Sequence, residues 1–316
     1  MSTDSIRVRV SGIEQVSPLI REFTLEAIDG EFLAFSPGSH VVVEMPAEPR
    51  PHRNAYSLLS DPRDSGCYRI AVRLQEQSRG GSVYMHESVK VGDELSITPP
   101  ANLFAPNWNA GKHLLLAGGV GITPFMAYLP ELKRRGADFE LHYLYRGSST
   151  GAYREQLKAE LGEQCFLYDS EAGQRCALGE LLADQPRGTH VYICGPEELI
   201  AGVREVTEEL GWPASHVHFE AFAAPQPGKP FEVELSRSGR TVKVDGETTL
   251  LEALEDAEVD VPHLCRGGVC GQCVTRVLSG DIEHRDEFLS AAEREQGDCI
   301  MPCVSRASGK RLVIDL

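Results

Sequence analysis

The chain has 316 residues, of which 47 are acidic and 31 basic, so its formal net charge is −16. This acidity argues against binding to nucleic acid, which favours a basic face, and against anionic membrane surfaces. The length allows two or three domains, and the shares of apolar and charged residues are those of a folded protein.

The N-terminal segment is polar and lacks the apolar core of a secretory signal. No apolar run approaches the roughly 18 residues of a membrane span. We therefore expect a cytoplasmic protein that does not act at a membrane. Five of the nine cysteines crowd into the segment from Cys265 to Cys303. In a cytoplasmic chain this crowding predicts metal binding or redox chemistry rather than disulfides.

Residues 1–107 alternate short apolar runs with Gly- and Pro-containing turns. Several short strands at regular spacing predict a small antiparallel β-barrel. The predicted strands lie at Ile6–Val10, Ile20–Leu25, His40–Met45, Tyr68–Leu74 and Glu94–Thr98.

Residues 108–225 alternate strand-like runs with helix-like stretches, which predicts an α/β domain with a parallel sheet. The strand-like runs lie at His113–Ala117, Phe139–Tyr145, Cys165–Tyr168 and His190–Cys194. One helix is well bounded, with Thr123 predicted as its N-cap, Pro124 as its first residue and Gly136 as its stop.

The Pro- and Gly-rich stretch 223–230 reads as a linker to a third domain, 226–316. Two short strands are predicted in that domain, at Phe231–Ser236 and Arg240–Val244. A helix follows, opened by Thr249 and Glu252 at capping-box spacing.

Cys265, Cys270 and Cys273 have the spacing C-x₄-C-x₂-C, and Cys303 follows at a distance. This is the plant-type [2Fe–2S] spacing. The glycines between the cysteines allow the loop to turn and bring backbone N–H groups toward the sulfurs. Structural zinc is the alternative, although zinc sites usually pair two C-x₂₋₄-C clips. Cys299 could compete as fourth ligand, but the sequence around Cys303 favours Cys303 and places Cys299 in the core.

From Phe231 to Leu316 the chain resembles plant-type ferredoxins, which implies a β-grasp (α+β) fold. No Cys-x-His or Cys-x-x-His sequence occurs, so the chain is not itself a Rieske protein.

A glycine-rich turn, Gly118–Pro124, joins the strand His113–Ala117 to the bounded helix. Such a turn lets pyrophosphate approach a helix N-terminus, although alone it could be only a tight connection. With Cys194-Gly195-Pro196 it resembles the pyridine-nucleotide domain of the ferredoxin–NADP reductase superfamily. The resemblance implies nucleotide contacts from Gly118, Gly119, Gly121, Thr123, Pro124, Cys194, Gly195 and Pro196.

The residues after the second and third strands bear on the choice of nucleotide. Arg146 stands alone after the second strand, while Asp169 and Glu171 follow the third. Acidic groups there would repel a 2′-phosphate, so NADH is favoured over NADPH, with Arg146 and Asp169 at the adenosine end.

A hydride carries two electrons and a [2Fe–2S] cluster accepts one, so a flavin is expected between them. The run from Arg53 to Ser57 resembles the Arg-x-Tyr-Ser flavin signature of the superfamily, except that Arg53 lies one residue too far from Tyr56, which leaves its role open. The run Arg79-Gly80-Gly81-Ser82 resembles the phosphate turn. A single phosphate turn favours FMN over FAD. By resemblance Phe222 would stack on the flavin, although it could be ordinary core.

The flavin residues implied in this way are Arg53, Ala55, Tyr56, Ser57, Val72, Arg73, Leu74, Gly80, Gly81, Ser82, Val83, Thr123 and Phe222.

The order of flavin barrel, nucleotide domain and ferredoxin domain resembles the phthalate dioxygenase reductase family over essentially the whole chain. Stretches such as Asn54–Ser60 and Arg79–Ser82 look most similar to carnitine monooxygenase reductase subunits, then to vanillate demethylase reductases. The resemblance implies electron transfer from NADH through FMN and the cluster to a Rieske-type oxygenase.

In such a reductase Ser57, Cys194 and Thr123 would align the nicotinamide with the flavin. The alternatives are a reductase for a di-iron hydroxylase or cytochrome P450, and a non-catalytic redox sensor. Nothing in the sequence predicts an obligate assembly, so a monomer is expected.

Overall fold

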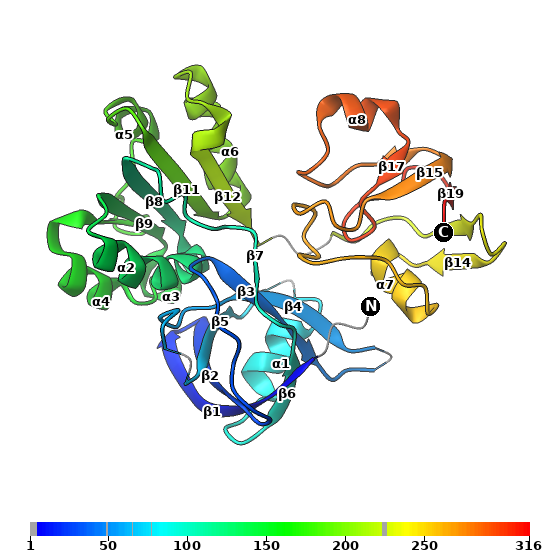
Figure 1. Ribbon diagram of the computed structural model, residues 1–316, viewed down its shortest axis with the longest axis horizontal. Coiled ribbons are helices and arrows are strands. Elements are labelled where there is room, and N and C mark those ends of the chain that lie inside the picture. Colours follow the sequence, from blue (N-terminus) through cyan, green and yellow to red (C-terminus); the bar gives the residue numbers. More distant parts are fainter. Residues whose placement is uncertain (1–4, 49, 65, 77, 223–225) are drawn as a thin grey trace. The chain divides into compact units, whose positions relative to one another are not determined.

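The computed structural model describes residues 5–48, 50–64, 66–76, 78–222 and 226–316. The chain forms two compact units, Ser2–Phe222 and Ala223–Leu316, and each is described by itself (Figure 1). No helix in the described ranges is long and apolar enough to cross a lipid bilayer.

The first unit begins with an antiparallel barrel in the strand order β4-β3-β6-β1-β2-β5, with β7 paired to β3. An isolated bridge between Leu58 and Ile70 joins the ends of this order and closes the sheet. Buried Val8 and Val10 alternate with exposed Arg7 and Arg9 along β1, because successive side chains point to opposite faces of a strand. The predicted barrel is confirmed.

The barrel elements are β1 (Ile6–Ser17), β2 (Ile20–Ala27), β3 (Ser39–Met45), β4 (His52–Ser57), β5 (Tyr68–Arg73), α1 (Gly81–Glu87), β6 (Glu94–Ile97) and β7 (Ala101–Asn102).

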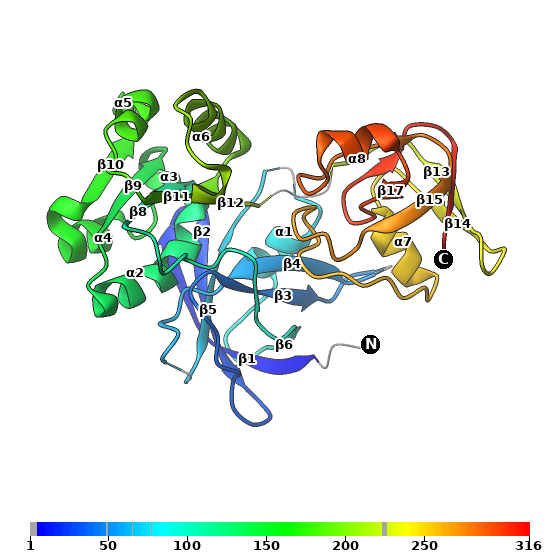
Figure 2. The same cartoon turned by 45° about the horizontal axis from the view of Figure 1, so that its top comes forward.

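The second half of this unit is a parallel sheet in the order β10-β9-β8-β11-β12. Its central strand β8 is buried along its whole length. Helices α2 and α4 pack on one face of the sheet, and α5 and α6 cover the other (Figures 1 and 2). This is the predicted α/β fold, in which both faces of a parallel sheet are covered by helices.

Its strands are β8 (Lys112–Gly118), β9 (Phe139–Tyr145), β10 (Cys165–Asp169), β11 (Thr189–Gly195) and β12 (Val217–Ala221). Its helices are α2 (Thr123–Arg135), α3 (Gly147–Thr150), α4 (Arg154–Leu161), α5 (Leu178–Ala183) and α6 (Glu197–Glu209), with 3₁₀ turns at Gly119–Ile122, Gly162–Gln164 and Ala214–His216.

Polar contacts join the barrel to the parallel sheet inside this unit. Arg134 on α2 forms an ion pair of 2.8 Å with Asp61. The hydroxyl of Tyr153 donates to the buried Glu22 at 2.7 Å, and Ser17 donates to the carbonyl of Ser149 at 2.9 Å. These contacts fix the barrel against the strand ends that carry the predicted nucleotide motifs.

The second unit is a mixed sheet in the order β14-β13-β19-β15-β17, in which β13 and β19 run parallel. Helix α7 packs on the core through Leu250 and Leu254. The predicted capping box opens this helix: Thr249 Oγ1 accepts the Glu252 N–H at 3.0 Å, and Glu252 Oε2 accepts the Thr249 N–H at 2.8 Å. The β-grasp fold is confirmed.

Its elements are β13 (Phe231–Leu235), β14 (Thr241–Val244), α7 (Leu250–Asp256), β15 (Thr275–Ser279), β16 (Ile282–Glu283), α8 (Ala291–Gln296), β17 (Cys299–Ile300), β18 (Arg306–Ala307) and β19 (Arg311–Ile314).

Candidate functional site

Strand β4 carries the flavin signature. Side chains alternate across a strand, so Asn54 and Tyr56 share one face while Arg53 and Ala55 share the other. Arg53 Nε forms an ion pair of 2.8 Å with Glu44. Asn54 therefore occupies the position two residues before Tyr56, where the signature has arginine. The predicted flavin role of Arg53 and Ala55 stays a prediction.

Tyr56 and Ser57 lie at the inner end of the same strand. Ser57 is buried. Burial raises the pKa of Tyr56. The phenol is thus neutral at physiological pH and keeps its proton for donation to a hydrogen-bond acceptor.

The turn before α1 has the close packing expected of a phosphate cradle. A Cβ on Gly80, whose φ is +109°, would lie 2.2 Å from His52 Nε2. A Cβ on Gly81 would lie 2.8 Å from Asn54 Oδ1. The positive φ of Gly80 favours glycine there, and at both places the backbone of the turn lies close to a β4 side chain. Ser82 uses its hydroxyl within the turn, accepting the Gln75 N–H at 3.2 Å.

His52 and Asn54 belong to the site as well, although no sequence motif marks them. Side chains alternate between the two faces of a strand, so residues two and four positions before Tyr56 share its face. This pattern identifies Asn54 and His52 only once β4 is known to begin at His52.

The end of β5 holds the other predicted flavin residues. Val72 is buried, while Leu74 and Val83 are half-buried. Arg73 Nε is buried and has no hydrogen-bond partner among the described residues. A buried cationic donor without a partner is costly, and an anionic or carbonyl group of a bound flavin would satisfy it. The residues of the barrel therefore fit a phosphorylated flavin.

The two nucleotide motifs meet at the carboxyl ends of adjacent parallel strands, where Ala117 on β8 pairs with Cys194 on β11. A Cβ on Gly121 would lie 2.0 Å from the Cys194 carbonyl oxygen, and one on Gly195 would lie 2.9 Å from Gly118 Cα. These glycines are required by contact between the two motifs. Gly119 differs, because its nearest neighbour would be Thr150 Cβ at 3.7 Å.

Gly119 therefore leaves its backbone open at the sheet edge where ligands of parallel sheets bind. A Cβ on Gly118 would also strike Pro196, at 2.6 Å from its Cδ. The structure thus brings together Gly118–Pro124 and Cys194–Pro196, the two segments that were predicted to hold the nucleotide.

The prediction of Thr123 as N-cap is wrong. A 3₁₀ turn, Gly119–Ile122, precedes α2, so Ile122 occupies the N-cap position and Thr123 is the first helical residue. Its hydroxyl donates to the Val120 carbonyl at 2.9 Å instead of accepting a helix N–H. Gly136 ends the helix in the left-handed conformation, as predicted.

Glu220, which neighbours Cys194, forms a further contact between the nucleotide sheet and the barrel. Strand β12 places Glu220 beside Cys194, and Ser57 Oγ donates to Glu220 Oε2 at 3.4 Å. Burial, reinforced by Glu220, raises the pKa of the Cys194 thiol. A neutral buried thiol is inert as a nucleophile, so Cys194 acts here as a packing surface.

The contact of Glu220 with Ser57 joins residues 163 positions apart in two domains, so no local sequence pattern indicates a role for Glu220. Phe222 is the last described residue of this unit and is exposed. Its stacking on flavin stays a prediction.

Charged residues surround the loop at the predicted adenosine end. The Gly147 N–H donates to Asp169 Oδ1 at 2.9 Å, and this bond lowers the pKa of Asp169. Arg146 Nε lies 3.4 Å from Glu171 Oε1. The cation that could read a 2′-phosphate is thus paired with a carboxylate, while Asp169 shapes the loop itself.

The four predicted cluster cysteines occur as two pairs. A hydrogen bond from Cys270, helped by backbone N–H groups, lowers the pKa of Cys265. The Gly267 N–H lies 3.3 Å from Cys265 Sγ. In the second pair Cys273 Sγ lies 3.3 Å from Cys303 Sγ. Two thiol pairs, each suited to one iron, fit the four-cysteine ligation of a [2Fe–2S] cluster.

The loop that carries Cys265, Cys270 and Cys273 requires glycine at two positions. Gly268 has φ +76°, and its Cβ would lie 2.7 Å from Val304 Cγ2. Gly271 has φ +74°, and its Cβ would lie 2.3 Å from the Phe288 ring. Cys299 is half-buried against the core, in agreement with its predicted structural role.

Zinc would need three or four ligands converging on one point. Across the described residues, no group of three or more His, Cys, Asp or Glu side chains is arranged to hold one metal ion. The four cysteines instead lie as two pairs, an arrangement that suits two irons.

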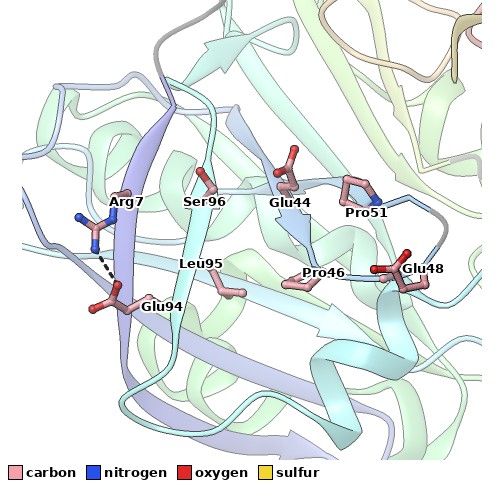
Figure 3. A pocket seen from close by; sticks show the side chains of 9 residues that line it. Arg7, Glu44, Pro46, Glu48, Pro51, Glu94, Leu95 and Ser96 are labelled. Carbon is pink, nitrogen blue, oxygen red and sulfur yellow. Dashed lines mark hydrogen bonds and ion pairs between the residues drawn. The ribbon is translucent and has the colours of Figure 1, made fainter. Parts of the chain in front are cut away.

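A pocket of about 420 Å³ opens on the barrel between β3 and β6 (Figure 3). Its lining includes Glu44, Glu94 and Arg7 but none of the predicted flavin residues. Arg7 pairs with Glu94 at 2.8 Å, and Glu44 pairs with Arg53 outside the lining. Glu94 is thus paired within the lining, whereas Glu44 is paired with a residue outside it.

Three families match successive parts of the chain. Residues 7–105 match the family described as an oxidoreductase FAD-binding domain. Residues 95–217 match the N-terminal domain of the dimethylamine monooxygenase subunit DmmA-like family. Residues 233–308 match the 2Fe-2S iron-sulfur cluster binding domain. The flavin and iron–sulfur assignments are confirmed at this level, without a distinction between FMN and FAD.

Several characterised proteins are similar over nearly the whole chain. A heme-dependent oxidative N-demethylase beta subunit of Ectopseudomonas mendocina is 54% identical, covering 98% of each chain. A carnitine monooxygenase reductase subunit of Escherichia coli is 47% identical, again with 98% of each chain covered. A vanillate O-demethylase oxidoreductase of Acinetobacter baylyi is 36% identical, with 98% of each chain covered.

The structure is similar to that of a phthalate dioxygenase reductase, with a TM-score of 0.87, 33% identity, and coverage of 99% of this chain and 98% of the other. That protein is described as a modular structure for electron transfer from pyridine nucleotides to [2Fe-2S]. With its flavin barrel, nucleotide sheet and four-cysteine ferredoxin unit, the chain belongs to the phthalate dioxygenase reductase family of electron-transfer oxidoreductases.

Proposed function

We propose that this chain is the NADH-dependent reductase component of a two-component Rieske-type oxygenase, with FMN in the barrel and a [2Fe–2S] cluster on Cys265, Cys270, Cys273 and Cys303. The observation that carries the proposal is the contact of Ser57 with Glu220 at 3.4 Å. It joins the proposed flavin barrel to the strand ends proposed to bind nicotinamide. Bound there, the flavin would accept hydride and release single electrons, which suit the cluster.

The residues at this junction supply position rather than acid–base chemistry. Hydride transfer depends on near-attack geometry, and Ser57, Thr123 and Cys194 are all buried. Their rotamers are therefore restricted by packing. The raised pKa of the Cys194 thiol keeps it neutral beside the proposed nicotinamide position.

FMN is proposed over FAD because one phosphate turn is present and its surroundings are filled. His52 and Asn54 lie against Gly80 and Gly81, where an adenosine extension would need room. Extraction of the cofactor followed by mass measurement would decide between the two flavins. NADH is proposed over NADPH because Arg146 is paired with Glu171.

The proposed oxygenase partner acts on a quaternary amine such as carnitine, by similarity to the carnitine monooxygenase reductase subunit. A second candidate is a heme-dependent N-demethylase, which is supported by the higher identity to the beta subunit of such an enzyme and by the dimethylamine monooxygenase family match. We also propose a cytoplasmic monomer, which sedimentation velocity would test.

Visible and EPR spectra before and after NADH addition test the proposal. We expect flavin bleaching within seconds and a rhombic signal from the reduced cluster. Bleaching without that signal would contradict transfer between the two groups, and the absence of bleaching would support a sensor rather than a reductase. Reconstitution with each oxygenase then separates the partners, through carnitine-dependent NADH consumption or through release of formaldehyde from a methylamine.

A further inference from the structure

The carboxylate of Asp286 lies between the two chain segments that carry the proposed cluster ligands. Its side chain is 0% exposed. On one side the Glu287 N–H donates to the Gly268 carbonyl at 3.0 Å, within the three-cysteine loop. On the other side Ser305 Oγ, two residues beyond Cys303, donates to Asp286 Oδ1 at 3.1 Å.

Asp286 packs directly on the three-cysteine loop. A Cβ on Gly268 would lie 3.2 Å from Asp286 Cα and 3.4 Å from Asp286 Cβ. The loop and the buried acid are therefore in van der Waals contact. Packed protein rather than bulk water separates the carboxylate from the cluster site, so its field is only weakly screened.

The groups around Asp286 compensate its charge incompletely. The Leu289 N–H donates to Oδ2 at 2.9 Å, and His284 Nδ1 lies 3.4 Å from Oδ1. Among the described residues the nearest permanent cation is Arg294, whose Nη2 donates to the Asp286 main-chain carbonyl and lies 3.9 Å from Oδ2. Its side chain is 36% exposed and makes no direct hydrogen bond to the carboxylate, so part of the negative potential of Asp286 remains.

We propose that Asp286 is a positioning residue that also sets the reduction potential of the [2Fe–2S] cluster, its buried negative charge disfavouring the reduced cluster. This inference rests on the proposed cluster site. Reduction adds one negative charge to the cluster, and Asp286 repels it across a low-dielectric interior. The loop N–H groups act in the opposite direction. Asp286 thereby makes the cluster a stronger electron donor to the next acceptor.

The test compares Asp286→Asn, Arg294→Gln and Glu295→Gln in the full chain carrying flavin and cluster. Asparagine keeps the shape of Asp286, and the Ser305 hydroxyl can turn to accept from the new amide. Glu295→Gln removes the same charge from an exposed position on α8, where solvent screens it. The midpoint potential is measured by redox titration of the EPR signal of the reduced cluster.

We expect Asp286→Asn to raise the ratio of reduced to oxidised cluster about tenfold at a fixed potential, which is about 59 mV for a one-electron couple. Arg294→Gln should shift the ratio about threefold the opposite way, and Glu295→Gln should leave it unchanged. Loss of local structure alone would not give opposite signs.

The inference is overturned if Asp286→Asn and Arg294→Gln shift the midpoint potential in the same direction. It is also overturned if neither variant shifts the potential more than Glu295→Gln does. If Asp286→Asn fails to retain the cluster, the titration of Arg294→Gln decides. A lower midpoint potential in Arg294→Gln would then support the inference, and an unchanged potential would overturn it. A wild-type protein without [2Fe–2S] absorption would instead refute the proposed function, so the two failures are distinguishable.

Discussion

The hydrogen bond between Tyr153 and Glu22 offers a direct measure of how firmly the barrel is joined to the nucleotide sheet. Tyr153 donates to Glu22 Oε2 at 2.7 Å, and Glu22 is only 7% exposed. Arg69 Nη1 lies 3.2 Å from the other carboxylate oxygen, with its side chain 42% exposed. Tyr153→Phe removes one of these two partners while the carboxylate stays buried.

The expected loss can be estimated from the charge state of the acceptor. A hydrogen bond to a charged group contributes about 1.5–3 kcal/mol. Arg69 remains and can move closer, so we take the lower end, about 1.5 kcal/mol. The left-handed backbone of Tyr153, φ 61°, is the same in the variant and cancels. At about 2–4 °C per kcal/mol for a unit of this size, the thermal midpoint should fall by about 3–6 °C.

Tryptophan fluorescence isolates the relevant unit, because both tryptophans of the chain, Trp108 and Trp212, lie within Ser2–Phe222. Tyr145→Phe is the matched control, since the Tyr145 hydroxyl has no hydrogen bond among those described, and its ring contact with Arg154 survives the substitution. A midpoint for Tyr153→Phe within about 1 °C of that control would refute the reasoning.

Three further predictions concern the cluster, the nucleotide and pH. Cys270→Ser should abolish the [2Fe–2S] EPR signal and cytochrome c reduction but leave NADH-to-ferricyanide activity largely intact. The control variant Cys299→Ser should keep the signal and both activities. Equal loss of both activities in Cys270→Ser would contradict the proposed order of electron transfer. Glu171→Gln frees Arg146 from its exposed ion pair. If the freed Arg146 contributes about 1 kcal/mol to binding of the 2′-phosphate, kcat/KM for NADPH should rise about fivefold. An unchanged value would contradict the placement of the adenosine end of the nucleotide beside Arg146. Burial, with smaller effects of His216, His218 and His113, lowers the pKa of His190 from 6.5 to about 4. Below pH 6.5 the unfolded chain therefore binds a proton at His190 that the folded chain does not bind. Stability should be full above that pH and fall as the pH drops toward 4. His190→Gln should make this fall shallower, and identical plots of thermal midpoint against pH for the variant and the wild type would contradict the prediction.

The features that the sequence predicted are local ones. The alternation of Val8 and Val10 with polar residues predicts a strand that is buried on one face. The apolar run of β8 predicts a strand that is buried on both faces. The spacing of Cys265, Cys270 and Cys273 is likewise set within a single loop. The capping box at Thr249 could be predicted because both partners lie within one helical turn.

The features that the sequence did not predict depend on register or on distant partners. Strand β4 contains the polar residues His52, Arg53 and Asn54. Because it lacks an apolar alternation, the sequence did not predict it as a strand. Thr123 has the composition of an N-cap, but the preceding 3₁₀ turn shifts the helix start. Only the folded chain brings Glu220 to Ser57, and a charged residue such as Asp286 would be expected at the surface.

The arrangement of β13 and β19 has a consequence for how the iron–sulfur unit comes into being. These are the first and the last strands of the unit in chain order, yet they are neighbours in the sheet, and β19 lies at its centre. During synthesis the sheet stays open down the middle until its final strand emerges. Cys303 precedes that strand, so its pairing with Cys273 awaits closure of the sheet. Cluster insertion is then expected to follow the emergence of β19, whereas the flavin unit, with its strands complete by Ala221, can fold before β19 is synthesised.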